Sequence, residues 1–140
     1  MTEYNRIFLD TSPIIYLLDE DVNFGEKVEH IFDEILENEK KMITSVITCT
    51  EYLSHSYRTN NTDKIDAFFE FLTDCDIPIC SVDVEIAKKA AKIRAEYKDF
   101  KTMDALQLAT ACINKCDLFL TNDKQLRQFK EIKCVTVDEL

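Results

Sequence analysis

The stretch that decides the fold reads Arg6-Ile-Phe-Leu-Asp-Thr-Ser-Pro-Ile-Ile-Tyr-Leu-Leu18. Its short apolar run is typical of a buried parallel strand. Thr11 or Ser12 is the expected N-cap of a helix that follows, and Pro13 is its expected first residue. Asp10 is therefore expected at the carboxyl end of a strand, where the ligand crevices of open α/β sheets lie. A structural role is equally open here, because Asp also caps helices well.

The composition predicts one globular domain over residues 1–140. The chain has 140 residues, of which 46% are hydrophobic, and these are enough for a core without disulfides. One Gly and two Pro leave no room for a glycine-rich phosphate loop or a dinucleotide-binding motif. The sequence shows neither a bilayer-length apolar run nor a signal peptide, so we expect a cytoplasmic protein with no membrane partner.

The cysteines predict reduced, mostly buried thiols. The chain has six, in apolar surroundings: Cys49, Cys75, Cys80, Cys112, Cys116 and Cys134. Cys112 and Cys116 could share a helix face, but no second cysteine pair or nearby His completes a zinc site.

The net charge of −10 has the wrong sign for a simple nucleic-acid-binding protein. The charge is uneven, however. Acidic residues are concentrated in segment 19–40, and basic residues in segment 88–101. Segment 88–101 predicts a basic patch that could bind nucleic acid. The alternative is that the acidic and the basic segment are both simply solvated helix faces.

The order of apolar patterns predicts a three-layer α/β/α sandwich around a central parallel sheet. Short apolar or β-branched runs alternate with stripes of helical spacing. The expected strands are 7–9, 42–44, 77–82, 118–121 and 132–137, and the expected helices are 13–18, 24–40, 46–57, 65–72, 86–97, 102–115 and 124–129.

Four acids stand at or near the beginnings of helices or the ends of strands: Asp10, Glu51, Asp104 and Asp123. A parallel sheet would gather them at one edge, where they would repel one another. Hard cations with oxygen ligands relieve such repulsion, so this pattern indicates a Mg²⁺ or Mn²⁺ site that can bind phosphate oxygens and orient a water. Taken singly, each acid also has a purely structural explanation. Asp10 could cap a helix, Asp104 could interact with a helix dipole, Asp123 could be a turn residue, and Glu51 could be a solvated helix residue.

The same segments resemble PIN-domain ribonucleases, specifically the VapC-like toxins. The resemblance spans nearly the whole chain and rests on Phe8-Leu-Asp10-Thr-Ser, Thr50-Glu51, Asp104-Ala-Leu-Gln-Leu-Ala-Thr-Ala111 and Leu120-Thr-Asn-Asp123. The chain departs from the common pattern at Lys101-Thr-Met103, where Leu-Pro is frequent.

The resemblance implies a function and a set of site residues. It implies that Asp10, Glu51, Asp104 and Asp123 coordinate Mg²⁺ or Mn²⁺ for RNA hydrolysis. It also implies that the hydroxyls of Thr121 and of Thr11 or Ser12 shape the site. A strand order of 3-2-1-4-5, a homodimer and a cognate antitoxin are further implications.

Basic residues that flank the acidic segments or lie in segment 88–101 are candidates for contacts with RNA phosphates. They are Arg58, Lys89, Lys92, Lys101, Lys124 and Arg127. His55 follows Glu51 by one helical turn and either faces the site or lies on the surface. His30 is expected to be solvated.

The leading hypothesis is a metal-dependent endoribonuclease that is the toxin of a toxin–antitoxin pair. A PIN-domain RNA-processing nuclease that is no toxin would have the same site. An Asp-nucleophile phosphatase would need an acid at the position of Ser12. A receiver-type signalling domain would need an acid pair after the first strand. A noncatalytic PIN-like scaffold would more naturally have lost one or more of the four acids.

Overall fold

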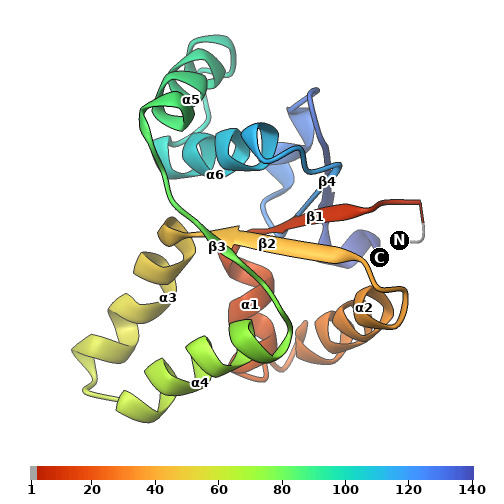
Figure 1. Cartoon of the computed structure of the whole chain (residues 1–140), viewed down its shortest axis with the longest axis vertical. Helices are drawn as coiled ribbons and strands as arrows, with labels where there is room; N and C mark the ends of the chain where they lie inside the picture. The colour runs from red at the N-terminus through yellow and green to blue at the C-terminus, as the bar shows by residue number, and fades with distance from the viewer. Residues whose placement is uncertain (1–2) are drawn as a thin grey trace.

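The computed structural model describes residues 3–140, and its elements alternate between strands and helices (Figure 1). They are β1 (Arg6–Leu9), α1 (Thr11–Leu18), α2 (Gly25–Glu37), β2 (Lys41–Ser45), α3 (Val46–Arg58), α4 (Thr62–Asp74), β3 (Ile79–Cys80), α5 (Val84–Glu96), α6 (Thr102–Ile113), β4 (Leu118–Thr121), the 3₁₀ helix η1 (Lys124–Gln128), β5 (Lys133–Thr136) and the 3₁₀ helix η2 (Val137–Glu139). No helix within this part of the chain is both long and apolar enough to cross a membrane.

The strands form one five-stranded parallel sheet in the order β3-β2-β1-β4-β5, which confirms the expected order. Central strand β1 pairs with both neighbours. Phe8 is in register with Ile43 of β2 and with Phe119 of β4. Because all strands are parallel, the residues that follow β1, β2 and β4 meet at the same edge of the sheet.

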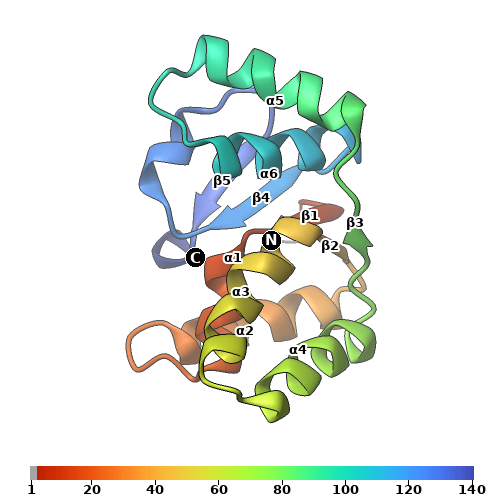
Figure 2. The ribbon, with the colours of Figure 1, turned by 90° about the vertical axis from the view of Figure 1, so that its left-hand side faces the viewer.

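Helices cover both faces of the sheet, which confirms the predicted α/β/α sandwich (Figures 1 and 2). Side chains of β1 alternate between the two faces. Ile7 and Leu9 join the core formed with α1, α2, α3 and α4, whereas Phe8 joins the core formed with α5, α6 and η1. On that second face the rings of Phe8 and Phe119 stack with centroids 5.2 Å apart.

Several predicted boundaries were wrong, most importantly the start of α1 and the extent of β3. Helix α1 begins at Thr11, and its N-cap is Asp10 rather than Thr11 or Ser12, so Pro13 is the third helical residue and not the first. Proline fits there because the first N–H groups of a helix have no intrahelical partner. The expected strand 77–82 is reduced to Ile79–Cys80 at the edge of the sheet.

Five helices end in a left-handed residue that is not glycine. These residues are Glu20, Glu39, Asn60, Asp76 and Lys115, with φ between 51° and 60°. After each of them the next N–H donates to the carbonyl five residues back in the Schellman pattern, as Cys116 N does to Ala111 O at 3.0 Å. The only glycine, Gly25, instead begins α2, where a Cβ would lie 3.2 Å from the carbonyl oxygen of Tyr16.

We expect Lys115→Gly to stabilise the protein. Lys115 is exposed with φ 60°, a conformation that is unfavourable for L-residues and free of strain for glycine. The net gain should be about 0.5–1 kcal/mol in the free energy of unfolding, measured by urea denaturation. Lys115→Ala is the matched control, since it removes the side chain and keeps the strain. Equal stability of the two variants would contradict the prediction.

Candidate active site

Asp10 lies at the centre of the carboxyl edge of the sheet. Its backbone N–H donates to Leu120 O at 2.9 Å and thus extends the pairing of β1 with β4. Its Oδ1 accepts from the N–H of Thr11 at 2.9 Å, and its Oδ2 accepts from the hydroxyl of Thr121 at 2.7 Å. The side chain therefore caps α1 and is hydrogen-bonded to β4. Asp10 thus has the capping role considered above, and its carboxylate still lies at the carboxyl edge of the sheet.

The environment of Asp10 disfavours its negative charge. Burial raises the pKa of Asp10 to about 6, although the hydrogen bonds from Thr121 and Thr11 act in the opposite direction. The negative charges of Asp104 and Glu51 raise this pKa further.

Glu51 reaches the site from the second turn of α3. Its carboxylate accepts a hydrogen bond from the Thr11 hydroxyl at 2.5 Å, while the residue as a whole is exposed. Thr11 thus contacts two acids, Asp10 through its N–H and Glu51 through its hydroxyl. Ser12, the alternative candidate, is half-buried in the first turn of α1.

Asp104 and Asp123 complete the group. Asp104 is half-buried in the first turn of α6, and its pKa is raised first by burial and then by the charges of Asp123 and Glu51, against the opposing charge of Lys101. Asp123 caps η1 by accepting from Gln125 N at 3.0 Å, and its own N–H donates to the Thr121 hydroxyl at 3.1 Å. Helix α6 itself has Lys101 at its N-cap position.

The four predicted acids lie close enough for their charges to shift pKa values within the group. Asp104 and Glu51 raise the pKa of Asp10, and Asp123 and Glu51 raise that of Asp104. The acids come from four separate segments that converge at one edge of the sheet (Figure 2). Their oxygens are hard ligands of the kind that Mg²⁺ and Mn²⁺ prefer, and their mutual repulsion is what a cation would relieve. The chemistry of the donor set thus fits a divalent cation.

The side chains do not form a preassembled metal cage. Among residues 3–140, no group of three or more His, Cys, Asp and Glu side chains is arranged to hold a metal ion. The hydrogen bonds show how the acids are stabilised instead. Both oxygens of Asp10 accept hydrogen bonds, and Glu51 accepts from Thr11.

A buried polar network beneath the acids was missed at the level of sequence. Its members are Thr44, Ser45, Thr48 and Gln107, each at most 1% exposed. The amide of Gln107 contacts Ser45, Thr48 and Asp10, and Thr48 also lies 3.3 Å from the Thr11 hydroxyl. The available signal was a glutamine three residues after Asp104 in a largely apolar helix.

The predicted RNA-binding cations differ in their surroundings. Lys89 forms an ion pair with Glu131 at 2.6 Å, which neutralises it locally. Lys124 and Arg127 each lie 3.4 Å from an acid of η2, Asp138 and Glu139 respectively. Both of these cations are also exposed, as are Arg58, Lys92 and Lys101 and the two histidines, His30 and His55.

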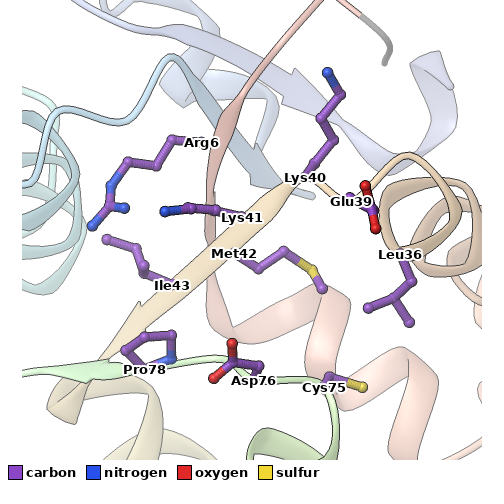
Figure 3. A pocket seen from close by; sticks show the side chains of 10 residues that line it. All are labelled: Arg6, Leu36, Glu39, Lys40, Lys41, Met42, Ile43, Cys75, Asp76 and Pro78. Atoms are coloured by element: carbon purple, nitrogen blue, oxygen red, sulfur yellow. The ribbon is translucent and has the colours of Figure 1, made fainter.

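A separate cavity of about 440 Å³ lies near the opposite edge of the sheet (Figure 3). It is lined by Arg6, Leu36, Glu39, Lys40, Lys41, Met42, Ile43, Cys75, Asp76 and Pro78. Because Arg6 and Lys41 are the first residues of β1 and β2, this cavity is at the amino ends of the strands and away from the four acids.

The sequence matches the family model of the PIN domain over residues 7–132. The chain therefore belongs to the PIN-domain family. Comparison with curated proteins gives no significant match.

Solved structures with the same fold include toxin–antitoxin proteins. DNA-bound VapBC from Salmonella typhimurium superposes with a TM-score of 0.77 and 17% identity, covering 95% of this chain and 98% of that one. FitAcB from Neisseria gonorrhoeae gives 0.73 and 24%, with coverages of 96% and 99%. VapC20 from Mycobacterium tuberculosis, a toxin that cleaves the sarcin-ricin loop, gives 0.66 and 16%, with coverages of 91% and 98%. At these identities the likeness shows the fold.

Asp10→Asn should change how stability depends on pH in EDTA. The folded protein binds a proton at Asp10 up to about pH 6, whereas an unfolded Asp releases it near pH 4. The wild type therefore loses free energy of unfolding, by up to about 3 kcal/mol, as the pH rises through this interval, and Asp10→Asn lacks this loss. Urea unfolding from pH 4 to 7 measures the difference between the two proteins. A difference independent of pH would contradict the raised pKa.

Proposed function

We propose that the chain is a single metal-dependent endoribonuclease domain that hydrolyses RNA phosphodiester bonds. The observation that carries this proposal is the convergence of Asp10, Glu51, Asp104 and Asp123 at one edge of the sheet. Burial and mutual repulsion raise the pKa values of Asp10 and Asp104 there. A protein that needed this edge only for folding would gain stability by losing one of these charges.

The roles of the residues follow from their surroundings. Asp10, Glu51, Asp104 and Asp123 would hold Mg²⁺ or Mn²⁺. When bound, the ion supplies positive charge for phosphate oxygens and for the leaving oxygen. The Thr121 hydroxyl donates to Asp10 and accepts from the N–H of Asp123, so it fixes the spacing of these two acids. The Thr11 hydroxyl orients Glu51 in the same way.

Membership of the PIN family and the nature of the structural relatives support the biological role. A toxin–antitoxin complex from Klebsiella pneumoniae shares the fold, and VapC20 is a toxin that cleaves the sarcin-ricin loop. We accordingly propose that this protein is a VapC-like toxin that acts in the cytoplasm as a homodimer and is bound by an antitoxin. An RNA-processing nuclease with the same site is the second candidate, and the retained acids argue against a noncatalytic scaffold.

RNA cleavage should require a divalent cation and Asp104. Purified protein incubated with structured RNAs and Mn²⁺ should cleave them, and EDTA should abolish cleavage. Asp104→Asn should lower the rate at least 100-fold while the metal-free protein melts at the same temperature or higher, because one like charge is removed. Asp99→Asn, which changes an exposed acid in the loop before α6, is the matched control and should cleave normally. Full activity in EDTA would refute the metal-dependent mechanism.

Exposed cations of segment 88–101 should contribute to RNA binding more than cations elsewhere. The double variant Lys92→Glu, Lys101→Glu should weaken binding of a single-stranded RNA. Its slope of log K against log salt should become shallower by about 0.7 for each RNA phosphate that the variant no longer neutralises. Lys40→Glu, Lys41→Glu makes the same charge change at the opposite edge (Figure 3). Equal weakening by both pairs would show a general effect of net charge and no local RNA contact.

A further inference from the structure

The buried network beneath the acid site is centred on Gln107 of α6. This side chain is 1% exposed, and each of its polar atoms has a partner. Its Oε1 accepts from the Ser45 hydroxyl, and its Nε2 donates to the Thr48 hydroxyl at 2.9 Å and toward Asp10 Oδ1 at 3.4 Å. The two buried hydroxyls therefore fix the orientation of the amide and present an N–H to the Asp10 carboxylate.

The partners of Gln107 belong to the same segments that carry the acids. Gln107 follows Asp104 by three residues, so both lie on one face of α6. Thr48 precedes Glu51 by three residues in α3. Ser45 is the last residue of β2, and α3 begins at the next residue. One amide thus connects three of the segments that bring carboxylates to the site.

An amide suits this position because it donates a hydrogen bond without carrying charge. A lysine or arginine would neutralise Asp10 and reduce the attraction of the site for a cation. A glutamate would add a fifth negative charge. An apolar residue would leave the buried hydroxyls of Ser45 and Thr48 without one of their partners.

We propose that Gln107, anchored by Ser45 and Thr48, is a positioning residue that holds the Asp10 carboxylate in place relative to Asp104 and Glu51. The inference rests on the proposed function, since it assigns Gln107 to the arrangement of the same acids. Residues that orient metal ligands through hydrogen bonds typically change metal affinity or activity 10- to 100-fold when they are removed.

The test compares Gln107→Met with Thr110→Val. Methionine keeps the length of the side chain and removes both polar ends. Thr110 is a buried polar residue of α6, one turn further on, whose hydroxyl donates to Leu106 O at 2.7 Å, so its replacement perturbs the helix away from the acids. Mn²⁺ binding is measured from the electron paramagnetic resonance signal of the free ion, and kcat and KM are measured with RNA.

For Gln107→Met we expect Mn²⁺ affinity and kcat to fall about 10- to 100-fold, with KM for RNA within about twofold of wild type. Thr110→Val should bind Mn²⁺ and cleave RNA as the wild type does. If both variants retain wild-type Mn²⁺ affinity and kcat, Gln107 is only a satisfied core residue and the proposal is overturned.

A second pair of variants keeps the test decisive if Gln107→Met does not fold. Thr48→Val removes the hydroxyl that anchors Nε2 and should weaken Mn²⁺ binding, and Thr48→Ser should restore it. Loss of Mn²⁺ affinity in Thr48→Ser as large as in Thr48→Val would overturn the proposal. Wild-type protein that binds Mn²⁺ without cleaving any RNA would refute the proposed function, while the Mn²⁺ affinities of the variants would still decide the role of Gln107.

Discussion

The pairing of β1 with β4 is the constraint on which the rest of the site depends. It continues past the last residue of β1, because the N–H of Asp10 donates to Leu120 O and the Thr121 hydroxyl donates to the Asp10 carboxylate. Since β1 is the central strand, Asp10 is placed in the middle of the carboxyl edge. The helix after β2, the start of α6 and the turn after β4 then bring Glu51, Asp104 and Asp123 towards it.

This arrangement lowers the stability of the folded protein and favours the binding of a cation. Burial and like charges raise the pKa values of Asp10 and Asp104, so the folded protein bears an electrostatic cost at neutral pH. The surrounding hydroxyls and the Gln107 amide reduce that cost with hydrogen bonds and add no positive charge. The remaining negative potential is what makes the edge attractive to a divalent cation.

Much of the fold and the identity of the acids could be predicted from sequence, because apolar periodicity and strand-end carboxylates depend on local patterns. The partners of those acids could not. Gln107 and Thr48 lie within helical stretches, and only the tertiary packing shows that they meet beneath Asp10. The start of α1 was misplaced for a related reason, since three consecutive residues can cap a helix and the contact of Asp10 with β4 decides among them. The left-handed residues that end five helices were also hidden, because glycine, their usual signal, is absent from those positions.

The central claim is that acids from four segments form one cation site, and paramagnetic broadening by Mn²⁺ tests it most directly. Mn²⁺ would be added at substoichiometric amounts to ¹⁵N-labelled protein, and the loss of amide signals would be followed by NMR. We predict that signals around Asp10, Glu51, Asp104 and Asp123 disappear together at the lowest Mn²⁺ concentrations. Broadening that appears first along the acidic helix α2, or that affects the four segments at different Mn²⁺ concentrations, would contradict a shared site.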